Sequence, residues 1–150
     1  MASNAIQHWT KEGWLPSNFY RSFTASAGIL VAPGPSLDKI DITKLLGPGK
    51  TVFGINTSYP KVRPDIWCGM DNPKCYNPLI FHEGITKIYR GGFQQHTVDG
   101  VKLKHLPNVH FISLDEVPYT EKTKFFSKEI FKTLNASFYS WTTCFTHYTR

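Results

Sequence analysis

The stretch that decides the fold is Gly28-Ile29-Leu30-Val31-Ala32-Pro33-Gly34-Pro35-Ser36-Leu37. Its aliphatic run is bounded by turn-forming residues, a pattern typical of a buried strand in a parallel sheet. We therefore expect residues 28–32 to form a strand at the centre of such a sheet. A tight turn and a helix that begins at Leu37 should follow it.

The turn after this strand has the features of an anion-binding loop. Gly34 lets another group approach the backbone closely, and Ser36 is a favourable N-cap for a helix. The N–H groups and the dipole at a helix N-terminus attract anions such as phosphate. Two interpretations are open at this point: a loop that cradles phosphate, and an ordinary connection between a strand and a helix.

Composition indicates a globular protein with an anionic partner. The chain has 150 residues, of which 41% are hydrophobic and 15% aromatic, enough for one domain with its own core. Seventeen basic residues against eleven acidic ones give a net charge of +6. The basic residues are scattered and form no dense run, which favours a nucleotide over nucleic acid as the partner.

The cysteines and the N-terminus indicate a protein of the cytoplasm. Cys68, Cys75 and Cys144 form no CxxC pair, which argues against a disulfide framework and against a structural zinc site. The chain starts without a signal-peptide pattern, and none of its apolar runs approaches the length of a membrane span. We expect no membrane partner and no metal site; Cys144 with His147 supplies too few ligands for one.

The order of apolar segments predicts a Rossmann-like α/β domain over residues 27–150, preceded by an N-terminal arm over residues 1–26. The arm is expected to be partly helical at residues 5–11 and to dock its aromatic side chains on the core. Within the domain, the predicted strands are residues 28–32, 51–56, 65–71, 86–90 and 109–114, and the predicted helices are residues 37–46 and 120–134. Asp99-Gly100 predicts the turn of a hairpin. Such a pattern implies a mostly parallel sheet flanked by helices, here shortened at its C-terminus because few residues follow the fifth strand.

Polar residues follow three of the predicted strands: Gly34-Pro35-Ser36, then Asn56, then Asp71 with Asn72. In open α/β sheets, ligands collect at the carboxyl ends of the strands. Asn and Ser side chains suit ribose or base edges, whereas Asp71 suits a ribose hydroxyl or a metal ion. Each of these residues, taken by itself, is also explained by the formation of a turn. Their coincidence at one edge favours a nucleotide site.

Two familiar phosphate-binding motifs are absent. Gly49-Lys50-Thr51 would need a glycine where Lys44 stands to complete a Walker A loop, and it precedes a predicted strand instead of a helix. The chain also contains no G-x-G-x-x-G dinucleotide fingerprint.

Three segments together resemble the N-terminal half of a family of nucleotide-using enzymes: residues 29–37, Val52-Phe53-Gly54-Ile55-Asn56, and residues 64–71. The family contains bacterial sialyltransferases, motility-accessory-factor glycosyltransferases of flagellin and archaeal 6-hydroxymethylpterin pyrophosphokinases. Its members open with a strand, a G-x-G-P-S-L turn and a second strand that ends in Asn. Here Ala32 stands at the first glycine and Pro33 at the variable position. Residues 138–143 resemble, more weakly, a later hydroxyl-rich segment that touches the nucleotide.

The resemblance implies a nucleotide-binding, glycosyltransferase-like domain that transfers a sugar from a nucleotide-activated donor. It places Gly34, Pro35 and Ser36 against the phosphates and Asn56 against the nucleotide or sugar. It further implies that Asp71 or Asn72 lies near the donor and that Ser140, Thr142 and Thr143 lie near the base or ribose. The catalytic residue is unknown, because nothing here matches the segment that supplies the base in the sialyltransferases.

Two alternatives remain beside sugar transfer. One is a pyrophosphokinase acting on a pterin-like alcohol, which requires Mg²⁺ held by Asp71 or another acid. The other is a non-catalytic binding or assembly module derived from such an enzyme. In that case a second copy would cover the sheet edge or apolar face left exposed by the short C-terminus, making the protein a homo-oligomer.

Overall fold

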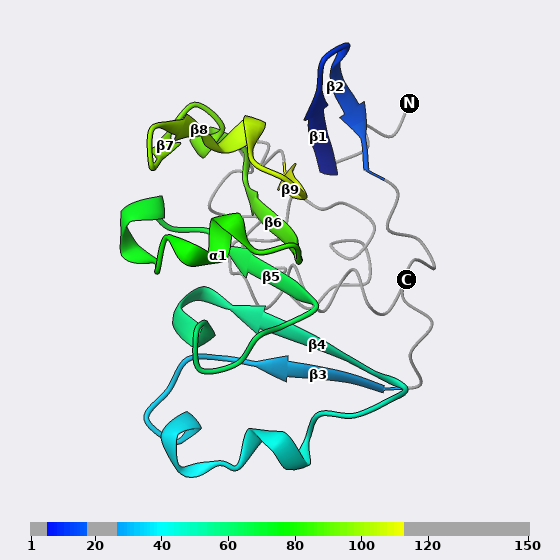
Figure 1. Ribbon diagram of the computed structural model, residues 1–150, viewed down its shortest axis with the longest axis vertical. Helices are drawn as coiled ribbons and strands as arrows, with labels where there is room; N and C mark the ends of the chain where they lie inside the picture. Colours follow the sequence, from blue (N-terminus) through cyan, green and yellow to red (C-terminus); the bar gives the residue numbers. More distant parts are fainter. Residues whose placement is uncertain (1–5, 18–26, 113–150) are drawn as a thin grey trace, which may run out of the picture.

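The computed structural model describes residues 6–17 and 27–112, which form a seven-stranded sheet and a separate two-stranded hairpin (Figure 1). The strand order of the sheet is β2-β1-β9-β6-β5-β4-β3. Its strands are β1 (Ile6–Thr10), β2 (Gly13–Pro16), β3 (Ala27–Val31), β4 (Lys50–Ile55), β5 (Ile66–Gly69), β6 (Thr86–Arg90) and β9 (Val109–Ile112). The predicted helix at 120–134 and the predicted site residues Ser140, Thr142 and Thr143 lie outside the described residues.

Five neighbouring strands, β3, β4, β5, β6 and β9, are parallel and follow one another in chain order. The mostly parallel sheet predicted from the sequence is therefore confirmed, and each of its five strands overlaps a predicted one. Short, continuous apolar runs bounded by Pro and Gly account for this success, since they are typical of strands buried on both faces.

Residues 6–16 of the N-terminal arm form a β-hairpin, so the helix predicted for residues 5–11 is wrong. β1 and β2 are antiparallel, and β1 also pairs antiparallel with β9, with Gln7 opposite Phe111. The rings of Trp9 and Trp14 meet edge to face across the hairpin, with centroids 5.3 Å apart. Cross-strand aromatic pairing and the free edge of β9 outweigh the local helical pattern. Trp14 also packs against the buried core, as predicted for the aromatic residues of the arm.

The connections between the parallel strands are short 3₁₀ turns and one short helix, α1 (Leu79–His82). The helix predicted for residues 37–46 is wrong: this segment forms two separate 3₁₀ turns, Leu37–Lys39 and Ile42–Lys44. Asp41 explains the break, because its carboxylate accepts a hydrogen bond from the backbone N–H of Thr43 at 3.2 Å. Such local bonds compete with helical ones.

The remaining short elements are the predicted hairpin and four further turns. β7 (Thr97–Val98) and β8 (Val101–Lys102) are joined by Asp99 and Gly100, whose φ angles of 50° and 80° are those of a type I′ turn. The other 3₁₀ turns are Asn56–Ser58, Pro73–Cys75, Gly91–Phe93 and Leu103–His105.

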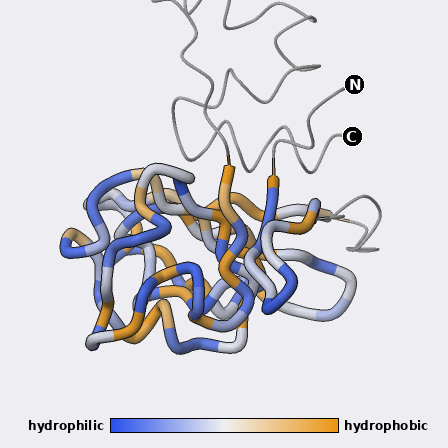
Figure 2. Tube along the Cα trace, turned by 90° about the horizontal axis from the view of Figure 1, so that it is seen from above, coloured by the Kyte–Doolittle hydropathy of each residue, from blue (hydrophilic) through white to orange (hydrophobic). Residues whose placement is uncertain are grey.

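The main core lies on one face of the sheet, which we call the connection face. There Trp67, Tyr89 and Phe111 from the strands pack against buried side chains of the connections, among them Phe81 and Leu103. In Figure 1, α1 and the β7–β8 hairpin lie toward the side to which the arrows of β3, β4 and β5 point. Figure 2 shows hydrophobic and hydrophilic stretches alternating along the trace, as expected for short buried strands joined by exposed loops.

β3 forms the outer edge of the described sheet, so the prediction that it is central does not hold for this part of the chain. It pairs only with β4 among the described strands, and the side chain of Leu30 is 45% exposed. The apolar run Ile29-Leu30-Val31 has the composition of a central strand but lacks a second described neighbour.

Candidate functional site

The carboxyl ends of β3, β4 and β5 lie at one edge of the sheet. These three strands are parallel neighbours in register, with Val31 opposite Gly54 and Ile55 opposite Cys68. The loops that follow them carry the predicted site residues Gly34, Pro35, Ser36, Asn56, Asp71 and Asn72. The structure therefore brings these predicted residues to the same edge.

Tyr76 joins two of these residues. Its hydroxyl lies 3.1 Å from Asn56 Oδ1 and 3.3 Å from Asp71 Oδ2, and both oxygens can accept its proton. The same hydroxyl accepts hydrogen bonds from the backbone N–H of Asp71 at 3.0 Å and of Met70 at 3.3 Å. The ends of β4 and β5 are thus tied together through one phenol.

The backbone of Asn56 is held in an unusual conformation. Its φ of 48° lies in the left-handed region, which Asn tolerates better than most residues. Its carbonyl accepts a hydrogen bond of 2.8 Å from the indole N–H of Trp67. These contacts fix the position of Asn56 at the end of β4.

Burial keeps the two phenols of this edge protonated. Tyr76 is 7% exposed, and burial, reinforced by the charge of Asp71, raises its pKa to about 12. Burial also raises the pKa of Tyr89, whose hydroxyl donates a hydrogen bond to the carbonyl of Asp71. Both tyrosines therefore act as hydrogen-bond donors at neutral pH and position Asp71 between them.

The loop after β3 does not open a helix, and this part of the prediction is wrong. Ser36 makes no side-chain capping bond, and the following 3₁₀ turn has three residues, too few for an appreciable helix dipole. A backbone bond of 3.0 Å from Leu37 N–H to Gly34 O closes the turn, and the buried Leu37 side chain anchors it. Residues 32–36 are exposed. A Cβ on Gly34 would meet only Ser36 Oγ, at 3.9 Å, so the space beside this backbone is open to a ligand.

Asn72 has a structural role. Its side-chain oxygen accepts a hydrogen bond of 3.0 Å from Lys74 N–H and so caps the turn Pro73–Cys75. The neighbouring Asp71 is exposed. It lies two residues beyond the end of β5, because this strand is shorter than predicted.

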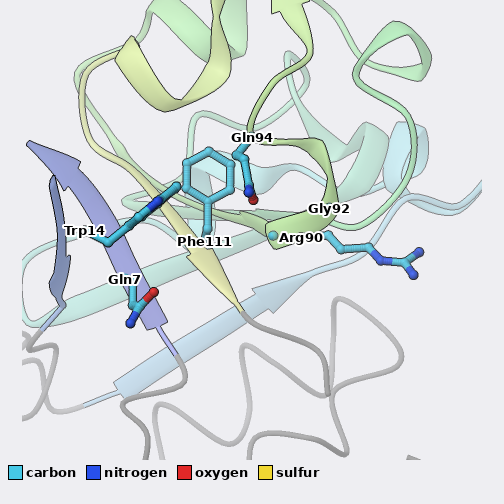
Figure 3. A pocket seen from close by; sticks show the side chains of 7 residues that line it. Gln7, Trp14, Arg90, Gly92, Gln94 and Phe111 are labelled. Carbon is cyan, nitrogen blue, oxygen red and sulfur yellow. The ribbon is translucent and has the colours of Figure 1, made fainter. Parts of the chain in front are cut away.

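A pocket of about 430 Å³ lies farther along the sheet, beside the carboxyl end of β6 (Figure 3). None of the predicted site residues in the described part of the chain lines it. Its lining residues are Gln7, Trp14, Arg90, Gly91, Gly92, Gln94 and Phe111. The sequence signal that marks it is the Gly91-Gly92 pair directly after a strand, a pattern typical of close backbone approach.

The walls of this pocket are aromatic and amide groups. The rings of Trp14 and Phe111 meet edge to face with centroids 5.6 Å apart. Figure 3 shows the Gln94 amide beside Phe111, and the Arg90 side chain extending away from the aromatic pair. Gly91 packs closely against β9, because a Cβ there would lie 2.8 Å from the carbonyl oxygen of Ile112.

Two histidines and a serine gather on the other face of the sheet. Ser17 Oγ lies 2.8 Å from His110 Nδ1 and 3.1 Å from His8 Nδ1. Burial, together with the positive charges of His8 and Lys87 nearby, lowers the pKa of His110 to about 4. His110 is therefore neutral at physiological pH. Within residues 6–17 and 27–112, no group of three or more His, Cys, Asp and Glu side chains is placed to hold a metal ion.

None of the helices in the described part of the chain is long and apolar enough to cross a membrane. Neither a protein-family model, nor a curated protein, nor a solved structure matches the chain. The resemblance of residues 28–72 to the nucleotide-using enzymes therefore stays a prediction that rests on the residues quoted for it.

Proposed function

We propose that this protein binds a nucleotide-activated sugar at the carboxyl edge of its parallel sheet and transfers the sugar to an acceptor. The observation that carries the proposal is the bridge by Tyr76 between Asn56 and Asp71. It gives two polar residues from neighbouring strands fixed positions beside the open loop after β3. Parallel sheets use this edge for ligands.

The three groups at the edge suit different parts of a nucleotide. The exposed loop with Gly34 and Ser36 offers backbone N–H groups and a hydroxyl to the phosphates. The amide of Asn56 suits the polar edge of a base or ribose, and the carboxylate of Asp71 suits ribose hydroxyls. The net charge of +6 favours an anionic ligand overall.

The pocket beside β6 suits the sugar or the acceptor. Aromatic rings such as Trp14 and Phe111 pack against the apolar face of a sugar ring, and the amides of Gln7 and Gln94 suit its hydroxyls. A volume of about 430 Å³ lies within the range of small-ligand pockets.

The sugar is then transferred by direct displacement at its anomeric carbon. An acceptor hydroxyl oxygen forms a bond to the anomeric carbon, and its proton passes to solvent water. The bond from that carbon to the phosphate oxygen breaks, and its electron pair stays on the departing phosphate. N–H and hydroxyl donors of the loop after β3 would stabilise that charge. We place this activity in the cytoplasm, where nucleotide-activated sugars are made.

Calorimetric titration with CMP, UDP-sugars, GDP-sugars and ATP, each with and without Mg²⁺, tests the proposal. We expect metal-independent binding of a nucleotide or its sugar. Binding of ATP only with Mg²⁺ would support the pyrophosphokinase instead. If the folded protein binds no nucleotide at millimolar concentration, both enzyme functions are refuted. A binding or assembly module is then favoured.

A matched pair of variants locates the site. Asn56→Asp keeps a side chain that tolerates positive φ and an oxygen for Tyr76, but places a negative charge where the nucleotide should lie. We expect a loss of at least about tenfold in affinity, or about 1.4 kcal/mol. Asn108→Asp is the control, because Asn108 also has positive φ (55°) but precedes β9, at the opposite edge of the sheet. The affinity of Asn108→Asp for the nucleotide should stay within about twofold of that of the parent protein.

A further inference from the structure

Arg90 is the one charged residue among the described residues that line the pocket beside β6. The others are aromatic rings, amides and glycines, so no lining carboxylate offsets its charge. Arg90 is exposed, and the ion pairs within the described part of the chain are all formed by other cations. Its guanidinium lies on the side of the pocket away from Trp14 and Phe111 (Figure 3). A ligand that packs against this aromatic pair therefore meets a positive charge at its outer end.

A second positive charge lies behind the aromatic wall. Lys104 Nζ is 4.2 Å from the centroid of the Trp9 ring, which in turn meets Trp14 edge to face. The one carboxylate of the β1–β2 hairpin, Glu12, is in its exposed turn next to Lys11, whose charge offsets it. The surroundings of the pocket are therefore positive and favour an anionic ligand.

The neutral groups of the pocket suit a sugar ring. Trp14 and Phe111 offer apolar surface to one side of such a ring. Gln7 and Gln94 each carry an amide that donates and accepts hydrogen bonds, as sugar hydroxyls also do. A Cβ at Gly92 would meet no atom within 4 Å, so the space beside this backbone is open. Ring and charge together indicate an acidic sugar, one that carries a carboxylate or a phosphate.

The pocket is next to the proposed nucleotide site on the same edge of the sheet. β5 and β6 are parallel neighbours, with Gly69 opposite Tyr89, and the Tyr89 hydroxyl donates a hydrogen bond to the carbonyl of Asp71. The carboxyl end of β6 is therefore one strand from Asp71 and two strands from Asn56. Because neighbouring strands are about 4.8 Å apart, two strands correspond to about 10 Å. At that separation a second substrate fits beside a nucleotide.

We propose that this pocket binds the acceptor of the transfer, and that the acceptor is an acidic sugar whose carboxylate or phosphate pairs with Arg90. Its role as the acceptor rests on the proposed function. A guanidinium is planar and forms two parallel hydrogen bonds to a carboxylate or a phosphate. Since Arg90 is exposed, it can pair with a substrate that arrives from solvent separately from the nucleotide.

NMR titration of the isotope-labelled protein with three sugars, in the absence of nucleotide, tests the proposal. The acidic sugars are methyl glucuronoside and glucose 6-phosphate, which separate the carboxylate from the phosphate, and methyl glucoside is the neutral control. We expect the backbone N–H signals of Gly91 and Gly92 and the indole N–H signal of Trp14 to shift. At least one acidic sugar should bind at least about fivefold more tightly than methyl glucoside. Inorganic phosphate alone should leave the indole signal in place, because it has no ring to pack on Trp14.

Three variants locate the charge that selects acidic sugars. Arg90→Gln should remove the preference and leave the affinity for methyl glucoside within about twofold of that of the parent protein. Arg90→Lys keeps the charge without the two parallel hydrogen bonds, so part of the preference should remain. Arg63→Gln is the matched control, because it removes an exposed arginine that pairs with Glu83 at 3.0 Å and precedes β5, at the amino end of that strand. Its preference should equal that of the parent protein.

Several results would overturn the proposal. They are equal affinity for the three sugars, no binding of either acidic sugar at millimolar concentration, and an equal loss of preference in Arg63→Gln. An indole shift with inorganic phosphate alone would also overturn it, because the pocket would then be a general anion site.

The proposed function fails separately, since nucleotide binding is read from the signals of Gly34, Asn56 and Asp71. If no nucleotide binds while acidic sugars do, the transfer and the acceptor role are refuted, but the assignment of the pocket to acidic sugars stands. If a nucleotide binds and the sugars show no preference, only the assignment of an acidic acceptor is refuted.

Discussion

Replacing Tyr76 by Phe removes the one hydroxyl that ties the ends of β4 and β5 together. The change is nearly isosteric, so the ring contacts with Trp67, at 5.0 Å between centroids, should persist. What is lost is the acceptor for the N–H groups of Met70 and Asp71 and the donor to Asn56 Oδ1.

The size of the effect follows from the burial of these groups. A buried polar group left without a partner destabilises a protein by about 1–3 kcal/mol. Met70 is 8% exposed, so its N–H is the group least able to find water, whereas Asp71 is exposed and can be solvated. We therefore expect a loss of about 2 kcal/mol in the free energy of unfolding. For a chain of this size, that corresponds to a fall in Tm of about 4–8 °C.

Chemical denaturation followed by circular dichroism measures this loss. The matched control is Tyr59→Phe, because the Tyr59 hydroxyl bonds to Glu83 at 3.2 Å, outside the core. We expect that variant to lose less than about 1 kcal/mol. If Tyr76→Phe lies within about 0.5 kcal/mol of the parent protein, or no lower than Tyr59→Phe, then the bridge does not hold the edge together.

Other predictions concern packing and pH. Gly69→Ala should destabilise the protein by at least about 2 kcal/mol, because the added Cβ would lie 2.3 Å from the Trp67 ring and 2.8 Å from Tyr89. Gly84→Ala is the control, because nothing lies within 4 Å of the added Cβ, and it should change stability by less than about 0.5 kcal/mol. If the two variants lower the Tm equally in thermal melts, the close packing around Gly69 is refuted. His110 has a pKa lowered from 6.5 to about 4, so its neutral form contributes stability that is complete above pH 6.5 and lost as the pH falls toward 4. The loss in the free energy of unfolding on acidification should approach about 3 kcal/mol in the parent protein and be smaller in His110→Gln. If stability falls with acid equally in both proteins, His110 is not its source. Tyr76, with its pKa raised to about 12, should make stability fall between pH 10 and pH 12. Burial also raises the pKa of Tyr89, so Tyr76→Phe should reduce this decline without abolishing it; a decline as steep as that of the parent protein would contradict the role of Tyr76.

The sequence predicted the parallel strands well because each is a short apolar run between strong turn formers. The hairpin at Asp99 and Gly100 was equally predictable, since both residues take the positive φ angles that its turn requires. Residues 5–11 and 37–46 were mispredicted for a different reason. The first pairs with the edge of β9, and the second is broken by the local hydrogen bond of Asp41, and neither effect is visible in periodicity.

The candidate site also has parts that the sequence predicted and parts that it did not. Placing Gly34, Asn56 and Asp71 at one edge required only that successive strands be parallel neighbours, which the pattern implied. The bridge through Tyr76 required knowing that the chain after β5 folds back over it, and Tyr76 lies in a stretch with Pro73 and Pro78 that has no regular period. The pocket depends on Gln7 and Trp14 meeting Gly91 and Phe111, a contact between segments far apart in the sequence.

The central claim is that a nucleotide binds at the carboxyl ends of β3, β4 and β5, and amide chemical-shift mapping during a titration tests it most directly. With the nucleotide that binds best in calorimetry, the backbone N–H signals of Gly34, Asn56 and Asp71 should shift together, with one apparent Kd. Those of Asp65 and Asn108, at the opposite edge, should stay in place. Shifts confined to that opposite edge, or no shifts at all at millimolar nucleotide with a folded protein, would contradict the claim.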